Sequence, residues 1–242
     1  MQSEVDVQSE SAASFDTFAF EATDPALVST SLVVRGDTLS TARASAHVFG
    51  LIPTGAQSTQ LGASVALPFS SQANTLRLGV SVIGARSDTL WIETLSTQIP
   101  EASSLRITSP DVHADVDGIE GAITIRDAQS VLIRHGNAVD VRTTGGNIDV
   151  HATSGSLISR GGNISLGIDA PITLPFSVRT EGGNIVITRA PNVGFMLVVD
   201  TVTSELNIDG SIQRVRGHLE QVIGEGGPIV HVENAPNIRI ER

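Results

Sequence analysis

The sequence has 242 residues, of which 40% are hydrophobic and only 3% aromatic, and its formal net charge is −11 at pH 7. All fifteen basic residues are arginine, so the chain repels nucleic acid on average and lacks the lysine of Schiff-base and phosphate-loop sites. Because it has no cysteine, disulfides, thiolate nucleophiles and cysteine-based metal sites are excluded.

The first fourteen residues, MQSEVDVQSESAAS, are polar and acidic, and they predict an N-terminal tail. The sequence has no cationic start followed by an apolar stretch, and no apolar run approaches the ~20 residues of a membrane helix. We therefore expect neither a signal segment nor a transmembrane segment in this chain.

The next part, residues 15–100, is expected to be a β region with irregular turn spacing. Apolar residues recur with a period of two, as in TLRLGVSV (residues 75–82), which indicates strands with one buried face. Three phenylalanines near the start of this part are expected to cover one open end of the fold. They are Phe15, Phe18 and Phe20.

A soft boundary at Pro100 separates this region from a more repetitive β region at 101–242. Gly, Asn, Asp, Ser and Pro clusters interrupt its apolar runs every ~8–12 residues, a pattern typical of all-β proteins. In SIQRVRGHLEQVIG (residues 211–224) the apolar spacing also fits a helix. We favour a strand there, since Gly217 would weaken a helix by about 1 kcal/mol relative to alanine.

The most distinctive motif is Gly-Gly-Asn-Ile, which occurs three times in the second region. It could form hairpin turns, because Gly and Asn tolerate positive φ, or it could form the corners of a β-solenoid, in which successive coils stack. The asparagines are 16 and then 21 residues apart, close to the length of one coil, so a single-stranded β-solenoid is favoured. The predicted structural turns comprise Gly145, Gly146, Asn147, Gly161, Gly162, Asn163, Gly182, Gly183 and Asn184.

Stacked coils make a specific prediction about these repeats. Ile148, Ile164 and Ile185 would lie on one another in the core, and the three preceding asparagines would form a ladder of hydrogen bonds. Each glycine would then be required by the backbone and would not bind a ligand.

The units DVDGIEGAITI, TTGGNIDV, SRGGNISL and TEGGNIVI resemble the bacterial "putative adhesin" family, a domain of unknown function expected to be a β-solenoid. The resemblance extends from about residue 76 to the C-terminus, although NAPNIRI departs from the family's final repeat and residues 15–50 match poorly. It implies an exported, surface or envelope protein with no established activity.

Few residues suggest chemistry. The six histidines are scattered without a metal-binding spacing, although stacking could bring distant ones together. Asp111, Asp115 and Asp117 lack the spacing of a calcium loop and are expected in a solvent-exposed acidic turn. We therefore predict no metal, cofactor or catalytic residue.

An enzyme is the alternative, because carbohydrate-active enzymes occur on β-helices. Its candidate residues are Asp149, Arg160 and Arg179, which could lie close together if coils stack in register. No aromatic platform for sugar is evident, since Trp91 is the single tryptophan and is expected in the core or at its rim.

We expect a non-enzymatic, extracytoplasmic scaffold or interaction protein with a protein partner. It would be either adhesin-like or an accessory subunit docked on a larger envelope complex, and the alternative is an extracytoplasmic carbohydrate-active enzyme.

Overall fold

The protein is all-β. The computed structural model describes residues 2–21, 30–51, 64–82, 90–110 and 112–242, which form strands and their connections without a helix. Within this described part, no segment forms an apolar helix of membrane-spanning length. The chain divides into two compact units, Met1–Gly121 and Ala122–Arg242. This division lies beyond the boundary expected at Pro100, because two strands after Pro100 pair within the first unit.

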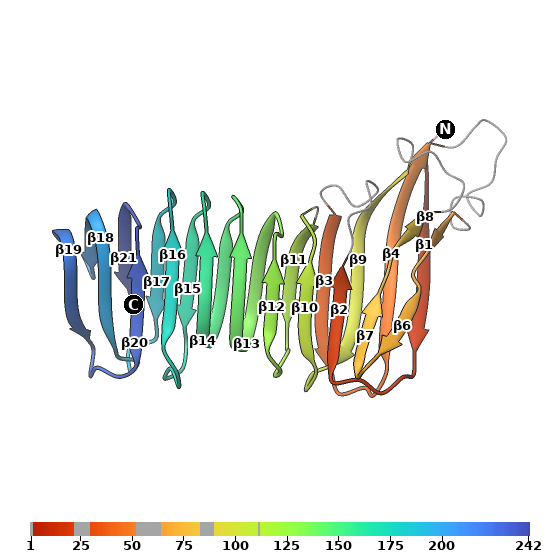
Figure 1. The fold of residues 1–242 in the computed structure, drawn as a ribbon, viewed down its shortest axis with the longest axis horizontal. Coiled ribbons are helices and arrows are strands. Elements are labelled where there is room, and N and C mark those ends of the chain that lie inside the picture. Colours follow the sequence, from red (N-terminus) through yellow and green to blue (C-terminus); the bar gives the residue numbers. More distant parts are fainter. Residues whose placement is uncertain (1, 22–29, 52–63, 83–89, 111) are drawn as a thin grey trace. The chain divides into compact units, whose positions relative to one another are not determined.

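The first unit consists of two layers of strands (Figure 1). One layer has the order β1–β4–β9–β3–β11 and the other β6–β7–β2–β10, while β5 and β8 pair with each other. Its strands are β1 (Gln2–Ser11), β2 (Thr17–Glu21), β3 (Thr30–Asp37), β4 (Ala42–Leu51), β5 (Val65–Ala66), β6 (Phe69–Gln72), β7 (Thr75–Leu78), β8 (Ser81–Val82), β9 (Leu90–Pro100), β10 (Ser104–Thr108) and β11 (Val112–Asp117).

The N-terminal segment differs from the polar tail that its composition suggested. It forms β1, which pairs antiparallel with β4 from Gln2↔Leu51 to Ser11↔Ala42. Val5 and Val7 alternate with polar residues and are half-buried, so the segment has the period-two pattern of an edge strand.

The sequence suggested that the phenylalanines near the N-terminus cover an open end of the fold. The structure instead places two of them inside the first unit. Phe18 and Phe20 lie on β2 and are fully buried. That strand has neighbours on both edges, since it pairs in parallel with β7 and with β10. These rings therefore fill the interior of the first unit.

The second unit is built from two rows of mostly parallel strands. One row has the order β12–β13–β14–β16–β20–β18 and the other β13–β14–β15–β17–β21–β18, so three long strands belong to both. The strands are β12 (Ile123–Arg126), β13 (Ser130–Thr143), β14 (Ile148–Ser159), β15 (Ile164–Ile168), β16 (Phe176–Thr180), β17 (Ile185–Arg189), β18 (Phe195–Ile208), β19 (Ser211–Ile223), β20 (Ile229–Glu233) and β21 (Asn237–Glu241).

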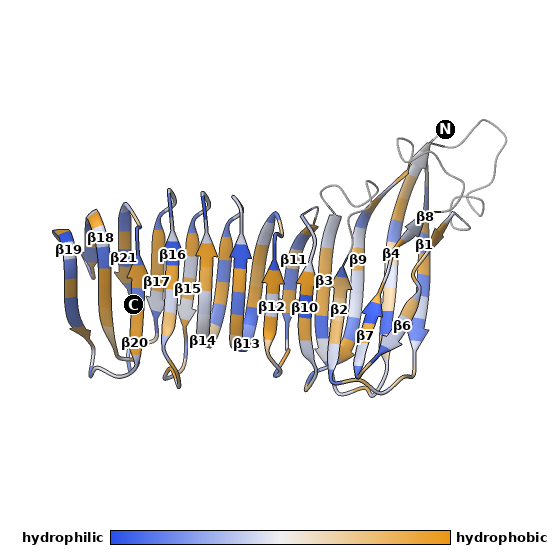
Figure 2. Cartoon of the chain, viewed as in Figure 1, coloured by the Kyte–Doolittle hydropathy of each residue, from blue (hydrophilic) through white to orange (hydrophobic). Residues whose placement is uncertain are grey.

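The register of these rows places apolar residues on apolar residues. Ile148 is paired with Ile164, Ile164 with Ile185, and Ile185 with Ile238. All four are at most 1% exposed, and Figure 2 shows the alternation of apolar and polar positions along the strands. The core of the second unit is therefore a set of stacked aliphatic side chains.

The last strands of the chain do not lie at the end of the rows. β20 lies between β16 and β18, and β21 between β17 and β18. The end of the rows is formed by β19, which pairs antiparallel with β18, so the strand expected at residues 211–224 is confirmed. On β19, the Gln213 side chain donates a hydrogen bond of 2.9 Å to Gln221.

The stacked core makes a testable prediction about two isoleucines. Replacing the fully buried Ile164 by alanine leaves a cavity between Ile148 and Ile185, and we expect a loss of about 2–5 kcal/mol in the free energy of unfolding. Ile158→Ala, at a half-buried position on β14, is the matched control and should cost about 1 kcal/mol or less. Urea unfolding of both variants measures the difference, and equal losses would contradict the stacked core.

Candidate functional site

The three Gly-Gly-Asn corners lie directly above one another in the second unit. The Asn163 backbone N–H donates to Oδ1 of Asn147 at 2.9 Å, and that of Asn184 donates to Oδ1 of Asn163 at 2.8 Å. Asn237 extends the ladder, because its Nδ2 lies 2.7 Å from Asn184 Oδ1. The strands that follow the corners run parallel, so the motif does not form the tips of hairpins.

The second glycine of each corner lies against the backbone of an earlier segment of the chain. A Cβ on Gly162 would lie 2.0 Å from the carbonyl oxygen of Gly146, and one on Gly183 would lie 2.0 Å from that of Gly162. A Cβ on Gly161 would meet nothing closer than 3.9 Å. Close approach, and not positive φ, therefore requires glycine at the second position.

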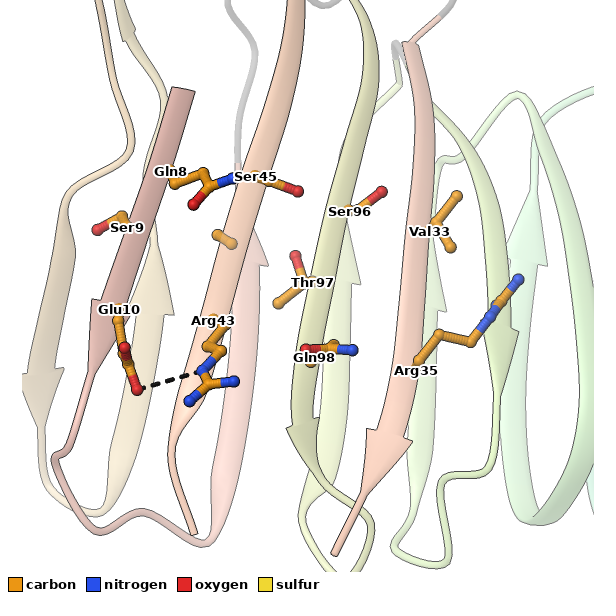
Figure 3. Close-up of a pocket in the computed structure, with 11 residues that line it drawn as sticks. Gln8, Ser9, Glu10, Val33, Arg35, Arg43, Ser45, Ser96, Thr97 and Gln98 are labelled. Carbon is orange, nitrogen blue, oxygen red and sulfur yellow. Dashed lines mark hydrogen bonds and ion pairs between the residues drawn. The ribbon is translucent and has the colours of Figure 1, made fainter. Parts of the chain in front are cut away.

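The candidate binding surface lies in the first unit, on the sheet formed by β1, β4, β9 and β3. A hollow with a volume of about 660 Å³ lies there, and Figure 3 shows the side chains around it. Two rows of paired residues cross the four strands. The first row is Gln8–Ser45–Ser96–Val33, and the second is Glu10–Arg43–Gln98–Arg35.

Two ion pairs hold the charged side chains of this hollow. Arg43 Nε lies 3.2 Å from Glu10 Oε1, so Nη1 and Nη2 extend beyond that contact (Figure 3). Arg35 binds the carboxylate of Asp115 through both terminal nitrogens, at 3.1 and 3.2 Å. Asp115 is thus on strand β11 and paired, not in an acidic turn, and Asp117 lies on the same strand. Asp111 lies outside the described residues.

Farther along the same strands, His47 lies among three carboxylates and next to Phe49. His47 Nδ1 lies 2.8 Å from Asp6 Oδ1, and this hydrogen bond, aided by the charges of Glu4 and Glu93, raises the pKa of His47. The His47 ring meets that of Phe49 edge to face, with centroids 5.4 Å apart.

Phe49 is the direct cross-strand partner of Trp91, which is 41% exposed. Such partners project from the same face of a sheet. Trp91 thus lies at the rim, one of the two positions that the sequence left open, and the sequence did not show that Phe49 is its cross-strand partner.

In the second unit, one carboxylate joins two histidines that are far apart in the sequence. Asp200 on β18 lies 2.7 Å from His218 Nδ1 on β19 and 2.7 Å from His231 Nε2 on β20. Glu220 lies 3.2 Å from His218 Nε2, and Glu233 lies 3.5 Å from His231 Nδ1. The stack thus brings together histidines that appear isolated in the sequence.

This network shifts two ionisation equilibria. The hydrogen bonds that His218 donates to Asp200 and, second in effect, to Glu220 raise the pKa of His218. The hydrogen bonds of His218 and His231 lower the pKa of Asp200. Among the described residues, no group of three or more histidine, aspartate or glutamate side chains has an arrangement that could hold a metal ion.

The residues proposed for an enzyme do not form one site. Asp149 lies in the row that contains β15, whereas Arg179 lies in the row that contains β16 and β20. Arg179 lies 3.5 Å from Glu181 and 3.7 Å from Glu233. Arg160 follows β14 at an exposed corner position. Stacking in register aligns residues that lie in the same row. Because these three residues do not lie in one row, stacking does not bring them together.

Comparison with known proteins gives remote structural likeness. No family model matches the chain, and no curated protein matches it. The chain is similar to a solved structure described as a putative adhesin from Bacteroides fragilis NCTC 9343, with 12% identity, 98% and 97% of the two chains covered and a TM-score of 0.44. For a putative adhesin from Parabacteroides distasonis ATCC 8503, the identity is 12%, the coverage 100% and 97% and the TM-score 0.43.

A third similar structure is a putative cell adhesion protein from Clostridium sporogenes ATCC 15579, with 10% identity, 100% and 99% coverage and a TM-score of 0.34.

The corner geometry predicts that two adjacent glycines differ in their tolerance of alanine. Gly162→Ala should lower the free energy of unfolding by about 1–3 kcal/mol or more, because the new methyl group would collide with the Gly146 carbonyl. Gly161→Ala is the control and should be nearly neutral, since its Cβ has room. Thermal and urea unfolding of the full chain measure both, and equal tolerance would show that the corners do not stack this closely.

The histidine network predicts a pH dependence. In an NMR titration, His218 should have a pKa above its ordinary value of 6.5, and Asp200→Asn should move it back toward that value. Because the folded pKa exceeds the unfolded one, this stabilising contribution is complete below pH 6.5 and is lost as the pH rises through the folded pKa. Asp149→Asn, an exposed carboxylate in the other row, should leave the titration unchanged. An identical pKa in the wild type and Asp200→Asn would contradict the network.

Proposed function

We propose that the protein is a non-enzymatic, adhesin-like interaction protein of the extracytoplasmic space. In this proposal the second unit is a β-solenoid, and the first unit carries the recognition surface. The observation that carries it is the polar hollow of about 660 Å³ on β1, β4, β9 and β3.

The solenoid interpretation is supported by the parallel register of the second unit. Each coil contributes to both rows, and the apolar residues, asparagines and second glycines lie on their equivalents in neighbouring coils. Parallel strands joined in this way form a stiff body, because shifting one strand by a single residue would expose its apolar side chains. Such a body suits a scaffold better than a protein that must open and close.

The hollow is suited to binding because its side chains stand on paired strands of a sheet. Gln8, Ser45, Ser96 and Gln98 present hydroxyl and carboxamide groups, each with both donors and acceptors. The charged groups are already paired, Arg43 with Glu10 and Arg35 with Asp115. Neutral hydrogen-bonding groups beside paired charges favour recognition over acid–base catalysis, which needs a group whose proton is free to move.

Two versions of this function differ in the role of the N-terminal segment. If the protein were an accessory subunit docked through a free tail, residues 1–14 would have to be available to a partner. Gln2–Ser11 instead pairs with β4 within the first unit and contributes to the hollow, which favours the adhesin-like version. The extracytoplasmic location rests on the resemblance of the Gly-Gly-Asn-Ile units to the repeats of exported proteins.

The proposal predicts that one arginine of the hollow controls attachment. Biotinylated full-length protein should capture a ligand from an envelope fraction of the source organism, and Arg43→Ala should reduce capture roughly tenfold, because a hydrogen bond to a charged group is worth about 1.5–3 kcal/mol. Arg239→Ala removes the same charge from an exposed position on β21 and should leave capture unchanged.

Mass spectrometry of the captured ligand before and after incubation tests the absence of catalysis. Equal capture by Arg43→Ala and the wild type would contradict the proposed surface. A ligand whose mass changes on incubation would favour the enzyme.

A further inference from the structure

We infer that the hollow and the nearby side chains of Phe49 and Trp91 together bind an uncharged saccharide that presents vicinal hydroxyl groups. This inference rests on the proposed function and names the ligand class of the same site. It is carried by the chemistry of the side chains on one face of the sheet β1–β4–β9–β3.

The two rows of the hollow match the chemistry of vicinal hydroxyls. Each sugar hydroxyl both donates and accepts a hydrogen bond, and the carboxamides of Gln8 and Gln98 offer a donor and an acceptor side by side. Ser45 and Ser96 lie next to each other between them, as direct cross-strand partners. The terminal nitrogens of Arg43, beyond its contact with Glu10, add paired donors that can bridge two neighbouring oxygens.

An aromatic platform lies on the same strands. Arg43, Ser45, His47 and Phe49 alternate along β4 and therefore share one face, which extends for ~20 Å at about 3.3 Å per residue. Phe49 is the cross-strand partner of the 41% exposed Trp91, so both aromatic side chains project from the far end of this face. Aromatic side chains can bury the apolar face of one sugar ring of an oligosaccharide, while the polar rows bind the hydroxyls of rings farther along it.

The charges on this face argue against an acidic saccharide. Asp6, Glu4 and Glu93 all lie within 4 Å of His47, and Asp6 and Glu4 are the cross-strand partners of His47 and Phe49. The whole chain carries a formal charge of −11. A sulfated or uronic polymer would therefore be repelled along most of its path, whereas an uncharged one would not.

The polarity of the rows argues against a protein ligand at this position. Protein interfaces centre on a fully buried apolar core surrounded by a polar rim. The two rows of the hollow contain a single apolar side chain, Val33, among eight paired positions. The polar groups are thus at the centre and the apolar rings at one end, which is the reverse of that arrangement.

The first test uses an array of defined uncharged oligosaccharides probed with the full-length protein. At least one should bind, and both Trp91→Ala and Gln98→Ala should weaken that binding by roughly tenfold. Leu174→Ala removes a comparably exposed apolar side chain from the second unit and should have no effect. Thermal unfolding establishes that each variant is folded, and Gln98→Ala, a change at an exposed position, keeps the test decisive if Trp91→Ala unfolds.

The second test separates failure of this inference from failure of the proposed function. The envelope fraction is treated either with periodate, which cleaves vicinal diols, or with a protease. Loss of capture after periodate but not after protease supports the inference. Loss after protease alone, with capture still dependent on Arg43 and Gln98, overturns the saccharide and leaves the proposed function intact. Capture that does not depend on these residues, or no capture and no bound oligosaccharide, overturns both.

Discussion

The close approach of backbones at the Gly-Gly-Asn corners is the constraint on which the second unit depends. Carbonyl oxygens of the preceding chain segments occupy the space that a Cβ would need at Gly146, Gly162 and Gly183. With the corners held at this distance, the asparagine side chains can bind the next backbone N–H groups, and the isoleucines that follow each corner come into contact. The stacked core is thus a consequence of the corners, and a period-two strand pattern alone would not produce it.

Sheet register also creates the candidate site in the first unit. The residues of each row come from four strands, and those strands are brought together by antiparallel pairing of β1, β4 and β9 and parallel pairing of β9 with β3. Because side chains alternate between the two faces of a strand, the outward positions carry the hydroxyl, carboxamide and guanidinium groups, while the inward positions are mostly apolar, with Thr97 as a buried polar exception. The same alternation therefore stabilises the unit and arranges its polar surface, and a shift of one residue would damage both.

The end of the second unit shows how the core of a stack can be closed. The hairpin of β18 and β19 turns at Asp209 and Gly210, both with positive φ, and β19 forms the last strand. Gln213 and Gln221 are the cross-strand partners of the fully buried Leu206 and Leu197, and their hydrogen bond lies where another apolar layer would otherwise follow. The C-terminal strands are inserted before this end: β20 lies between β16 and β18, and β21 lies between β17 and β18.

The sequence by itself determined the all-β class, the strand at residues 211–224 and the positions at which like residues recur, because periodicity and glycine placement are local properties. An Asp-Gly turn signal at residues 209–210 also pointed to the terminal hairpin, although its significance was missed. Only the tertiary structure decided the pairing of β1 with β4, the insertion of β20 and β21, the Phe49–Trp91 pair and the bridge from His218 through Asp200 to His231. The physical reason is that a period of two tells which side chains share a face of one strand, whereas the choice of neighbouring strands depends on burial and hydrogen bonding across the whole chain.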